Sequence, residues 1–265
     1  MSRGRTWMKA LAGDAVEAPV PSVLCADCEL EGETTRFLAV VPDPESPFQR
    51  ARNGELGLRE AWTLARLVRE AVESDLSGSR RAIVAVVDLP GQAYGRLEET
   101  AALHLALAAA SDAYATARLA GHPVVALIVG EALSGGFLAH GFQANRILAL
   151  DDPGVTVHAM HEEAAARVTM RTVADLRRLA DSVPPLAFDA ATWASLGMCE
   201  PLIGGVDVED PGPDDVRTVR QRLAASISEA RDSPRDLSVR LASEGARENR
   251  QASIAVRAKL AEQWC

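Results

Sequence analysis

The sequence predicts an α/β protein in which helical crossovers join parallel strands, followed by a helical C-terminal region. Two apolar runs, 81–91 and 122–130, are too continuously apolar to alternate, as expected for strands that are buried on both faces. An Ala-rich helical stretch at 96–121 lies between them, which suits a crossover between parallel strands. After residue 162 the pattern becomes helical, and this change sets the C-terminal region apart.

Bulk composition narrows the functional class. The chain has 265 residues, 48% of them hydrophobic, which is enough to bury a sizeable core in one large domain or two. The net charge of -9 argues against non-specific binding to nucleic acid or to anionic lipid. No apolar run approaches the roughly 20 residues of a membrane span, and the N-terminus lacks the apolar core of a secretory signal. We therefore expect a cytoplasmic protein.

The four cysteines do not form a recognisable metal-binding pattern. They are Cys25, Cys28, Cys199 and Cys265. Cys25 and Cys28 form a lone C-x-x-C, whereas a zinc ribbon needs a second pair. We expect reduced thiols and no metal site.

The elements before the first buried strand can be assigned in order. Residues 1–20 are predicted to form a helix and a loose, Pro-containing connection. A strand at 34–42 ends at proline, and an irregular loop spans 43–54. Apolar residues at helical spacing then predict a helix over 54–74.

The elements after residue 130 are shorter. Residues 134–143 are expected to form a short helix with Ser134 as its N-cap. Two short strands are expected within 146–159, around the turn "DDPG". Later helices are predicted at 172–183, 187–197, 213–231 and 236–263.

The stretch "GEALSGGFLAHG" (130–141) places glycines between a strand and a helix. Backbone N–H groups at a helix N-terminus have no intrahelical partner and suit an anion. The anion could be a phosphate, although the phosphate-loop motifs are not matched, or an oxyanion formed during a reaction. Alternatively, the glycines only let the helix pack on the sheet. A serine nucleophile is disfavoured, since Ser134 does not lie in G-x-S-x-G.

Another glycine loop, "DLPGQAYG" (88–95), follows the first buried strand; because it comes earlier in the chain it is called the first glycine loop, and 130–141 the second. Pro90 and Gly91 form the turn, and Gly95 precedes the next helix. Tandem strand–loop–helix units can bring both loops to the carboxyl edge of a parallel sheet, where ligands bind. The alternative is an ordinary Pro-Gly turn.

These two motifs together resemble the carboxyltransferase branch of the crotonase superfamily. "VVDLPGQAYG" and "GHPVVALIVGEALSGGFLAHG" correspond to its D-x-P-G-x-x-x-G and G-x-x-x-S-G-G loops. The resemblance covers roughly 80–205. It implies a single crotonase-like domain (ββα superhelix) over 1–265, with a core at about 34–205 and C-terminal helices at about 206–265.

A narrower resemblance is to the gamma subunit of biotin-independent malonate decarboxylase. It rests on "PFQRARNGE" (47–55), "QAYGRLEE" (92–99), "AHGFQANRILALDDPGVTVHAM" (139–160) and "AAAR" (164–167). It implies pairing with a homologous beta subunit, a malonyl thioester carried by the CoA-like prosthetic group of an acyl-carrier delta subunit, and an alpha acyl-transferase subunit. The implied reaction is decarboxylation to the acetyl thioester, with neither biotin nor a metal bound to this chain.

The resemblance also implies roles for residues of the two loops. The amides of Gly136 and Phe137 would form an oxyanion hole, with Gly135 allowing close approach. Further substrate-binding residues would be Pro90, Gly91, Gly95, Ser134 and His158. Candidate proton donors are His104, His140, His158, His161 and Tyr94, and the position of Tyr94 in a glycine loop favours it.

Three points stay open at this stage. His161, Glu162 and Glu163 depart from the family pattern, so a binding role for 161–163 is doubtful. A biotin-dependent carboxyltransferase subunit would use the same fold and oxyanion logic. A non-catalytic scaffold for the beta subunit is the third possibility.

Overall fold

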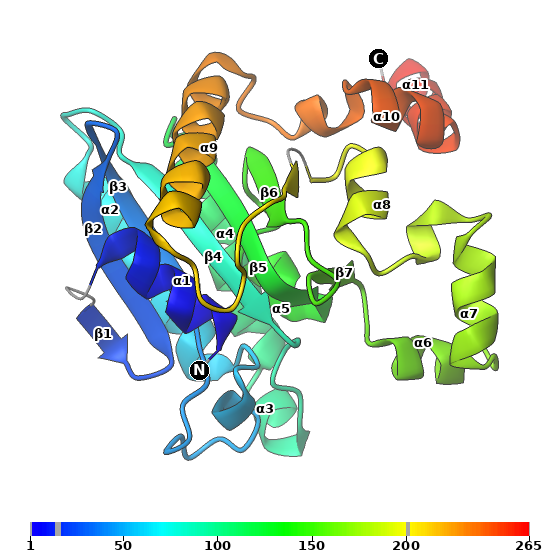
Figure 1. Cartoon of the computed structure of the whole chain (residues 1–265), viewed down its shortest axis with the longest axis horizontal. Coiled ribbons are helices and arrows are strands. Elements are labelled where there is room, and N and C mark those ends of the chain that lie inside the picture. The colour runs from blue at the N-terminus through cyan, green and yellow to red at the C-terminus, as the bar shows by residue number, and fades with distance from the viewer. Residues whose placement is uncertain (1, 14–16, 200–201, 265) are drawn as a thin grey trace.

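The computed structural model describes residues 2–13, 17–199 and 202–264. Residues 14–16 of the expected N-terminal connection and residues 200–201 lie outside the described residues. The described part of the chain forms an eight-stranded sheet with the order β1-β2-β3-β4-β5-β6-β8, and β7 pairs with β5 (Figure 1). The strands are β1 Glu17–Val20, β2 Val23–Leu30, β3 Glu33–Val40, β4 Ala82–Leu89, β5 Val124–Leu133, β6 Arg146–Leu150, β7 Thr156–His158 and β8 Leu202–Ile203.

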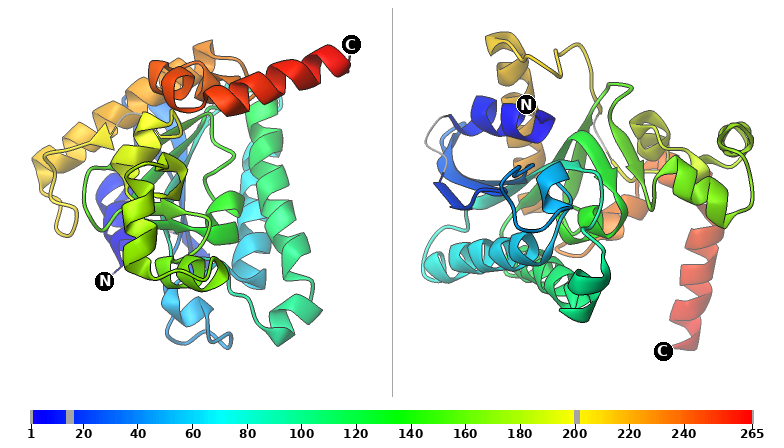
Figure 2. Two further views of the ribbon diagram at one scale, coloured as in Figure 1. Left: turned by 90° about the vertical axis from the view of Figure 1, so that its right-hand side faces the viewer. Right: turned by 90° about the horizontal axis from the view of Figure 1, so that it is seen from below.

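Helices connect and cover these strands. They are α1 Arg3–Ala12, α2 Leu58–Ser74, α3 Arg96–Thr100, α4 Leu103–Leu119, α5 Ser134–Ala139, α6 Glu162–Val168, α7 Val173–Ala180, α8 Ala190–Ser195, α9 Pro213–Asp232, α10 Glu244–Asn249 and α11 Gln251–Gln263, with 3-10 turns η1 Ala51–Asn53, η2 Pro184–Leu186 and η3 Ser238–Leu241. Helices α2 and α4 pack together on one face of the sheet, and α1 and α9 cover the other (Figures 1 and 2).

The centre of the sheet is parallel, as the sequence predicts. Strands β3, β4, β5, β6 and β8 run parallel. Phe37, Val84 and Val125 stand at matching positions across three of them and have no exposed surface. Helices on both faces remove these strands from water, which explains why their sequences do not alternate.

The antiparallel edge of the sheet is not anticipated by the sequence analysis. Strand β2 pairs antiparallel with β3 through a tight turn at Glu31 and Gly32, both with positive φ. This is the geometry of a two-residue hairpin. Val23 and Leu30 of β2 belong to the hydrophobic core, so the core starts before residue 34. It also extends past 205, because α9 contributes Val219, Leu223 and Ile227.

Two predicted long helices are interrupted. The helix expected at 96–121 is broken between α3 and α4, where Ala102 adopts a φ of 62°. Alanine propensity does not reveal this break, whereas burial of Leu103 fixes the start of α4. The helix expected at 236–263 is divided into η3, α10 and α11. Arg240 donates to the carbonyls of Phe142 and Ala144, which anchors η3 to the body of the protein.

Candidate active site

The two glycine loops meet at one edge of the sheet. One loop follows β4 and the other follows β5, and these strands are parallel neighbours. An ideal Cβ on Gly136 would lie only 2.5 Å from the carbonyl oxygen of Gly91. A side chain cannot fit at that distance, so glycine is required at 136 to let the two backbones touch. The expected meeting of the loops is confirmed.

The amides in the first turn of α5 differ in their availability. The Gly135 N–H donates to the Gln92 side-chain oxygen at 2.8 Å. Gly136 is the third residue of α5 and so has no intrahelical acceptor. Across residues 2–13, 17–199 and 202–264, no acceptor is hydrogen-bonded to its amide. Phe137 is the fourth residue, and within the described residues its amide likewise has no hydrogen bond to Leu133 or to a side chain. The neighbouring amides of Gly136 and Phe137 are therefore both available as donors for a ligand.

Ser134 does not cap this helix, and the expectation of a serine N-cap is wrong. The N-cap is Leu133, which keeps the extended conformation of β5 because it pairs with His158 of β7. The chain then turns at Ser134, which has a φ of 56°, and α5 begins there. A non-glycine residue at such a φ is uncommon and marks a constrained turn.

The segment 47–55 packs on the first glycine loop. The Arg50 guanidinium lies 3.9 Å from the centre of the Tyr94 ring and forms an ion pair with Glu55 at 2.7 Å. Tyr94 remains 54% exposed on the other side.

His140 belongs to the core and not to a solvent-accessible site. Its side chain is fully buried, with Nδ1 2.9 Å from the Tyr114 hydroxyl and Nε2 3.2 Å from the Val86 carbonyl. Burial lowers the pKa of His140 to about 4. The imidazole is therefore neutral at neutral pH, and it has no path to a substrate.

His158 lies beside the second glycine loop. Its ring stacks on Phe188 at 3.8 Å between centroids, and its Nδ1 accepts from the Met160 amide at 3.2 Å. Burial lowers the pKa of His158. In contrast, His104 and His161 are exposed on the surface of α4 and at the start of α6. Of the five candidate donors, His158 and Tyr94 lie at the loops without being fully buried, and His161 lines the cavity beside the second loop.

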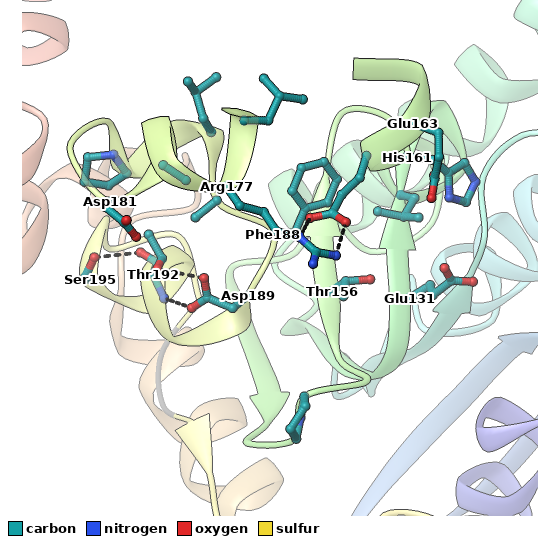
Figure 3. A pocket seen from close by; sticks show the side chains of 18 residues that line it. Glu131, Thr156, His161, Glu163, Arg177, Asp181, Phe188, Asp189, Thr192 and Ser195 are labelled. Carbon is teal, nitrogen blue, oxygen red and sulfur yellow. Dashed lines mark hydrogen bonds and ion pairs between the residues drawn. The ribbon is translucent and has the colours of Figure 1, made fainter. Parts of the chain in front are cut away.

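A cavity of about 780 Å³ adjoins the second loop between α6–α8 and the ends of β5 and β7 (Figure 3). Leu133, which directly precedes Ser134, lines it. An ion pair between Arg177 and Glu162 at 2.6 Å lies within its lining. Glu131 also lines the cavity, and burial raises its pKa. The charged side chains that line this cavity are acidic except for Arg177.

Metal and membrane features are not found in the described residues. Residues 2–13, 17–199 and 202–264 contain no cluster of three or more His, Cys, Asp or Glu side chains suited to a metal ion. In the same part of the chain, no helix combines the length and apolar character of a membrane span. Cys25 and Cys28 lie on β2 as part of the hairpin.

The sequence analysis missed two participants at this edge of the sheet. Gln92 lies inside a motif that sequence reasoning treated only as a turn, and its contact with Gly135 depends on the tertiary fold. Arg50 was noticed only as part of a family-specific segment. The one signal in the sequence for Gln92 is that a polar side chain directly follows Pro90 and Gly91 inside the glycine loop 88–95.

The chain has a crotonase-like fold, which carboxyltransferases also adopt. Transcarboxylase 12S illustrates the shared fold, with a TM-score of 0.66 at 18% identity over 87% of this chain and 42% of that one. The model of the malonate decarboxylase gamma subunit family matches residues 51–264, and the chain belongs to that family.

Three relatives give the likeness more detail. A Pseudomonas malonate decarboxylase hetero-tetramer in complex with coenzyme A contains a chain that is 52% identical, with a TM-score of 0.94 and full coverage of both chains. The Pseudomonas MdcD-MdcE hetero-dimer matches at 50% identity and a TM-score of 0.91, again over both whole chains. Malonyl-S-ACP:biotin-protein carboxyltransferase of Malonomonas rubra is 35% identical over 158 residues, 58% of this chain. The match spans only 54% of that curated relative.

Proposed function

We propose that this chain, paired with a homologous beta subunit, decarboxylates a malonyl thioester to the acetyl thioester. The observation that carries the proposal is the unpartnered Gly136 amide at the contact of the two glycine loops. Membership in the malonate decarboxylase gamma subunit family supports it. The substrate would be carried on the CoA-like prosthetic group of an acyl-carrier subunit, and this chain would bind no cofactor covalently.

The proposed reaction relies mainly on backbone amides and needs few side-chain groups. When the bond between the α-carbon and the carboxylate breaks, CO2 leaves and the electron pair moves into the thioester as an enolate. The Gly136 amide, with that of Phe137 beside it, stabilises the charge on the thioester oxygen. A proton then adds to the α-carbon and gives the acetyl group. Tyr94 and His158 are the candidate donors on this chain.

The loop residues around this hole would hold the acyl group. Gly91 and Gly95 allow the backbone to come close, and Pro90 fixes the first turn. Ser134 and His158 border the second loop. We assign these five positions to substrate binding, in addition to the contribution of Gly135 and Gly136 to the hole.

The proposed assembly follows from the single hole on this chain. The beta subunit would supply the opposing hole, the delta subunit the carrier, and the alpha subunit the transfer of new malonate. The solved Pseudomonas hetero-dimer and hetero-tetramer support a stable pair with one related subunit.

A second candidate is transfer of the carboxyl group to a biotin protein. The relative from Malonomonas rubra is named for that reaction, and its 35% identity supports this candidate. The match with the Pseudomonas malonate decarboxylase is higher and covers the whole chain, so we favour direct release of CO2.

The experiment is an assay of a malonyl thioester on purified carrier protein, with this chain alone, with the beta subunit, and with the pair plus a biotinylated acceptor. We expect CO2 release only with the pair and no requirement for biotin. Carboxyl transfer that depends on the biotinylated acceptor would favour the second candidate. Full activity of the beta subunit alone would leave this chain a scaffold.

A further inference from the structure

Gln92 connects the two glycine loops through its side chain. The side-chain oxygen accepts from the Gly135 N–H at 2.8 Å. It lies so close over Gly135 that a Cβ there would be 3.2 Å from that oxygen. The first loop therefore contacts the second by two means, the backbone approach of Gly91 to Gly136 and the side chain of Gln92.

The backbone of Gln92 is itself held on both sides. The Leu56 N–H donates to the Gly91 carbonyl at 2.9 Å, and the Ala93 N–H donates to the Leu56 carbonyl at 2.8 Å. Leu56 is fully buried. The side chain of Gln92 thus starts from a backbone that two hydrogen bonds fix to the segment before α2, and its half-buried position limits its freedom further.

The second glycine loop needs a contact from outside, such as that of Gln92, to hold its position. Ser134 turns the chain with a positive φ, and α5 that follows has only six residues. Without an external contact, a short helix begun by a constrained turn can shift. The bond from Gly135 to Gln92 fixes the peptide directly before the Gly136 amide. It also satisfies the Gly135 donor, so that the amides of Gly136 and Phe137, and not that of Gly135, are left for the substrate oxygen.

We propose that Gln92 is a positioning residue that sets the direction of the Gly136 amide toward the thioester oxygen; this rests on the proposed function. Gln92 does not touch the reacting atoms. Its effect is on the geometry in which the enolate forms, and small displacements of a donor reduce the rate of the chemical step.

The experiment compares Gln92→Met with Gln143→Met in the complex with the beta subunit. Methionine keeps the length of the side chain and removes the acceptor. Gln143 is also half-buried, and its side chain has no hydrogen bond to any residue within the described ranges, so it is the matched control. We expect Gln92→Met to lower kcat about 10- to 100-fold at unchanged KM, and Gln143→Met to change neither.

A second readout does not depend on activity. In the isolated chain labelled with 15N-glycine, exchange of the Gly135 amide should be about 10-fold faster in Gln92→Met. In Gln92→Glu the carboxylate can accept the same bond, and slow exchange should return. Unchanged exchange of Gly135 in Gln92→Met would overturn the proposed tie. Faster exchange with an unchanged kcat would show that the tie does not serve catalysis.

These outcomes stay distinct from failure of the proposed function. If wild-type pairs release no CO2, the proposed function fails whatever the exchange of Gly135 shows. If wild-type pairs are active, the kcat of Gln92→Met tests only the positioning role of Gln92.

Discussion

The loop edge of the sheet and the C-terminal arm, residues 236–264, differ in how the chain holds them. Strands β4 and β5 are almost wholly buried, and the loops after them touch backbone to backbone. Helix α11, in contrast, has no buried residue and extends away from the body (Figure 2). Contacts within the chain thus fix the position of the loops, whereas few such contacts hold α11 in place.

The largest effect on stability is expected in the core behind the loops. Leu127 of β5 has no exposed surface. Leu127→Ala removes buried methyl groups and leaves a cavity, and should lower the free energy of unfolding by about 2–5 kcal/mol. Urea denaturation of the isolated chain measures this. A loss below about 1 kcal/mol would show that the core at β5 relaxes freely, contrary to the comparison.

The pH dependence of stability also tests this core. The pKa of His140 is depressed from 6.5 to about 4 by burial, so the unfolded chain binds a proton more readily between these values. The contribution of His140 is fully present above pH 6.5 and is lost as the pH falls toward 4. Wild type should lose about 3 kcal/mol more than His140→Gln over that range. Parallel stability curves for the two proteins would contradict a buried, neutral His140.

The junction of the two regions should show an intermediate effect. The buried guanidinium of Arg240 donates at 2.6 Å to the carbonyls of Phe142 and Ala144. Arg240→Leu leaves both carbonyls without this donor and should cost about 1–3 kcal/mol. The exposed Arg247 supplies the control Arg247→Leu, for which we expect little change in a urea titration. Equal effects of the two substitutions would show that η3 is not anchored in this way.

The smallest effect is expected in the arm itself. Leu260 of α11 is 49% exposed. Leu260→Ala should change the free energy of unfolding of the isolated chain by no more than about 0.5 kcal/mol. Thermal or urea unfolding suffices to check this. A loss comparable to that of Leu127→Ala would place α11 in the core and remove the contrast between the regions.

Sequence alone could predict the region that local patterns control. The continuous apolar runs gave the parallel strands, and the glycines after them gave the loops and their common edge. The break at Ala102 escaped prediction because alanine supports helix on both sides of it, and packing of Leu103 decides where α4 starts. The cap at Ser134 was wrong because pairing of Leu133 with β7 carries the strand into the position of the cap.

The site was predictable only in part for a similar reason. Glycine spacing indicates where two backbone segments approach closely, but it does not show which amide N–H is left without an acceptor in the chain. That depends on the contact of Gln92 with Gly135, between residues 43 positions apart in the chain. Sequence likewise could not separate His140 from His158, because burial and neighbours make one a core residue and leave the other beside the loop.

The proposed stabilisation of the thioester oxygen by the Gly136 amide is tested most directly by kcat for CO2 release by the pair with Gly136→Ala. A Cβ at 136 meets the Gly91 carbonyl and must displace the amide, whereas Gly78 has open space around it and Gly78→Ala serves as the control. We predict a loss of about 100- to 1000-fold in kcat for Gly136→Ala, with the complex intact, and no change for Gly78→Ala. Equal kcat for the two variants in well-folded complexes would contradict the claim and move the chemistry to the partner subunit.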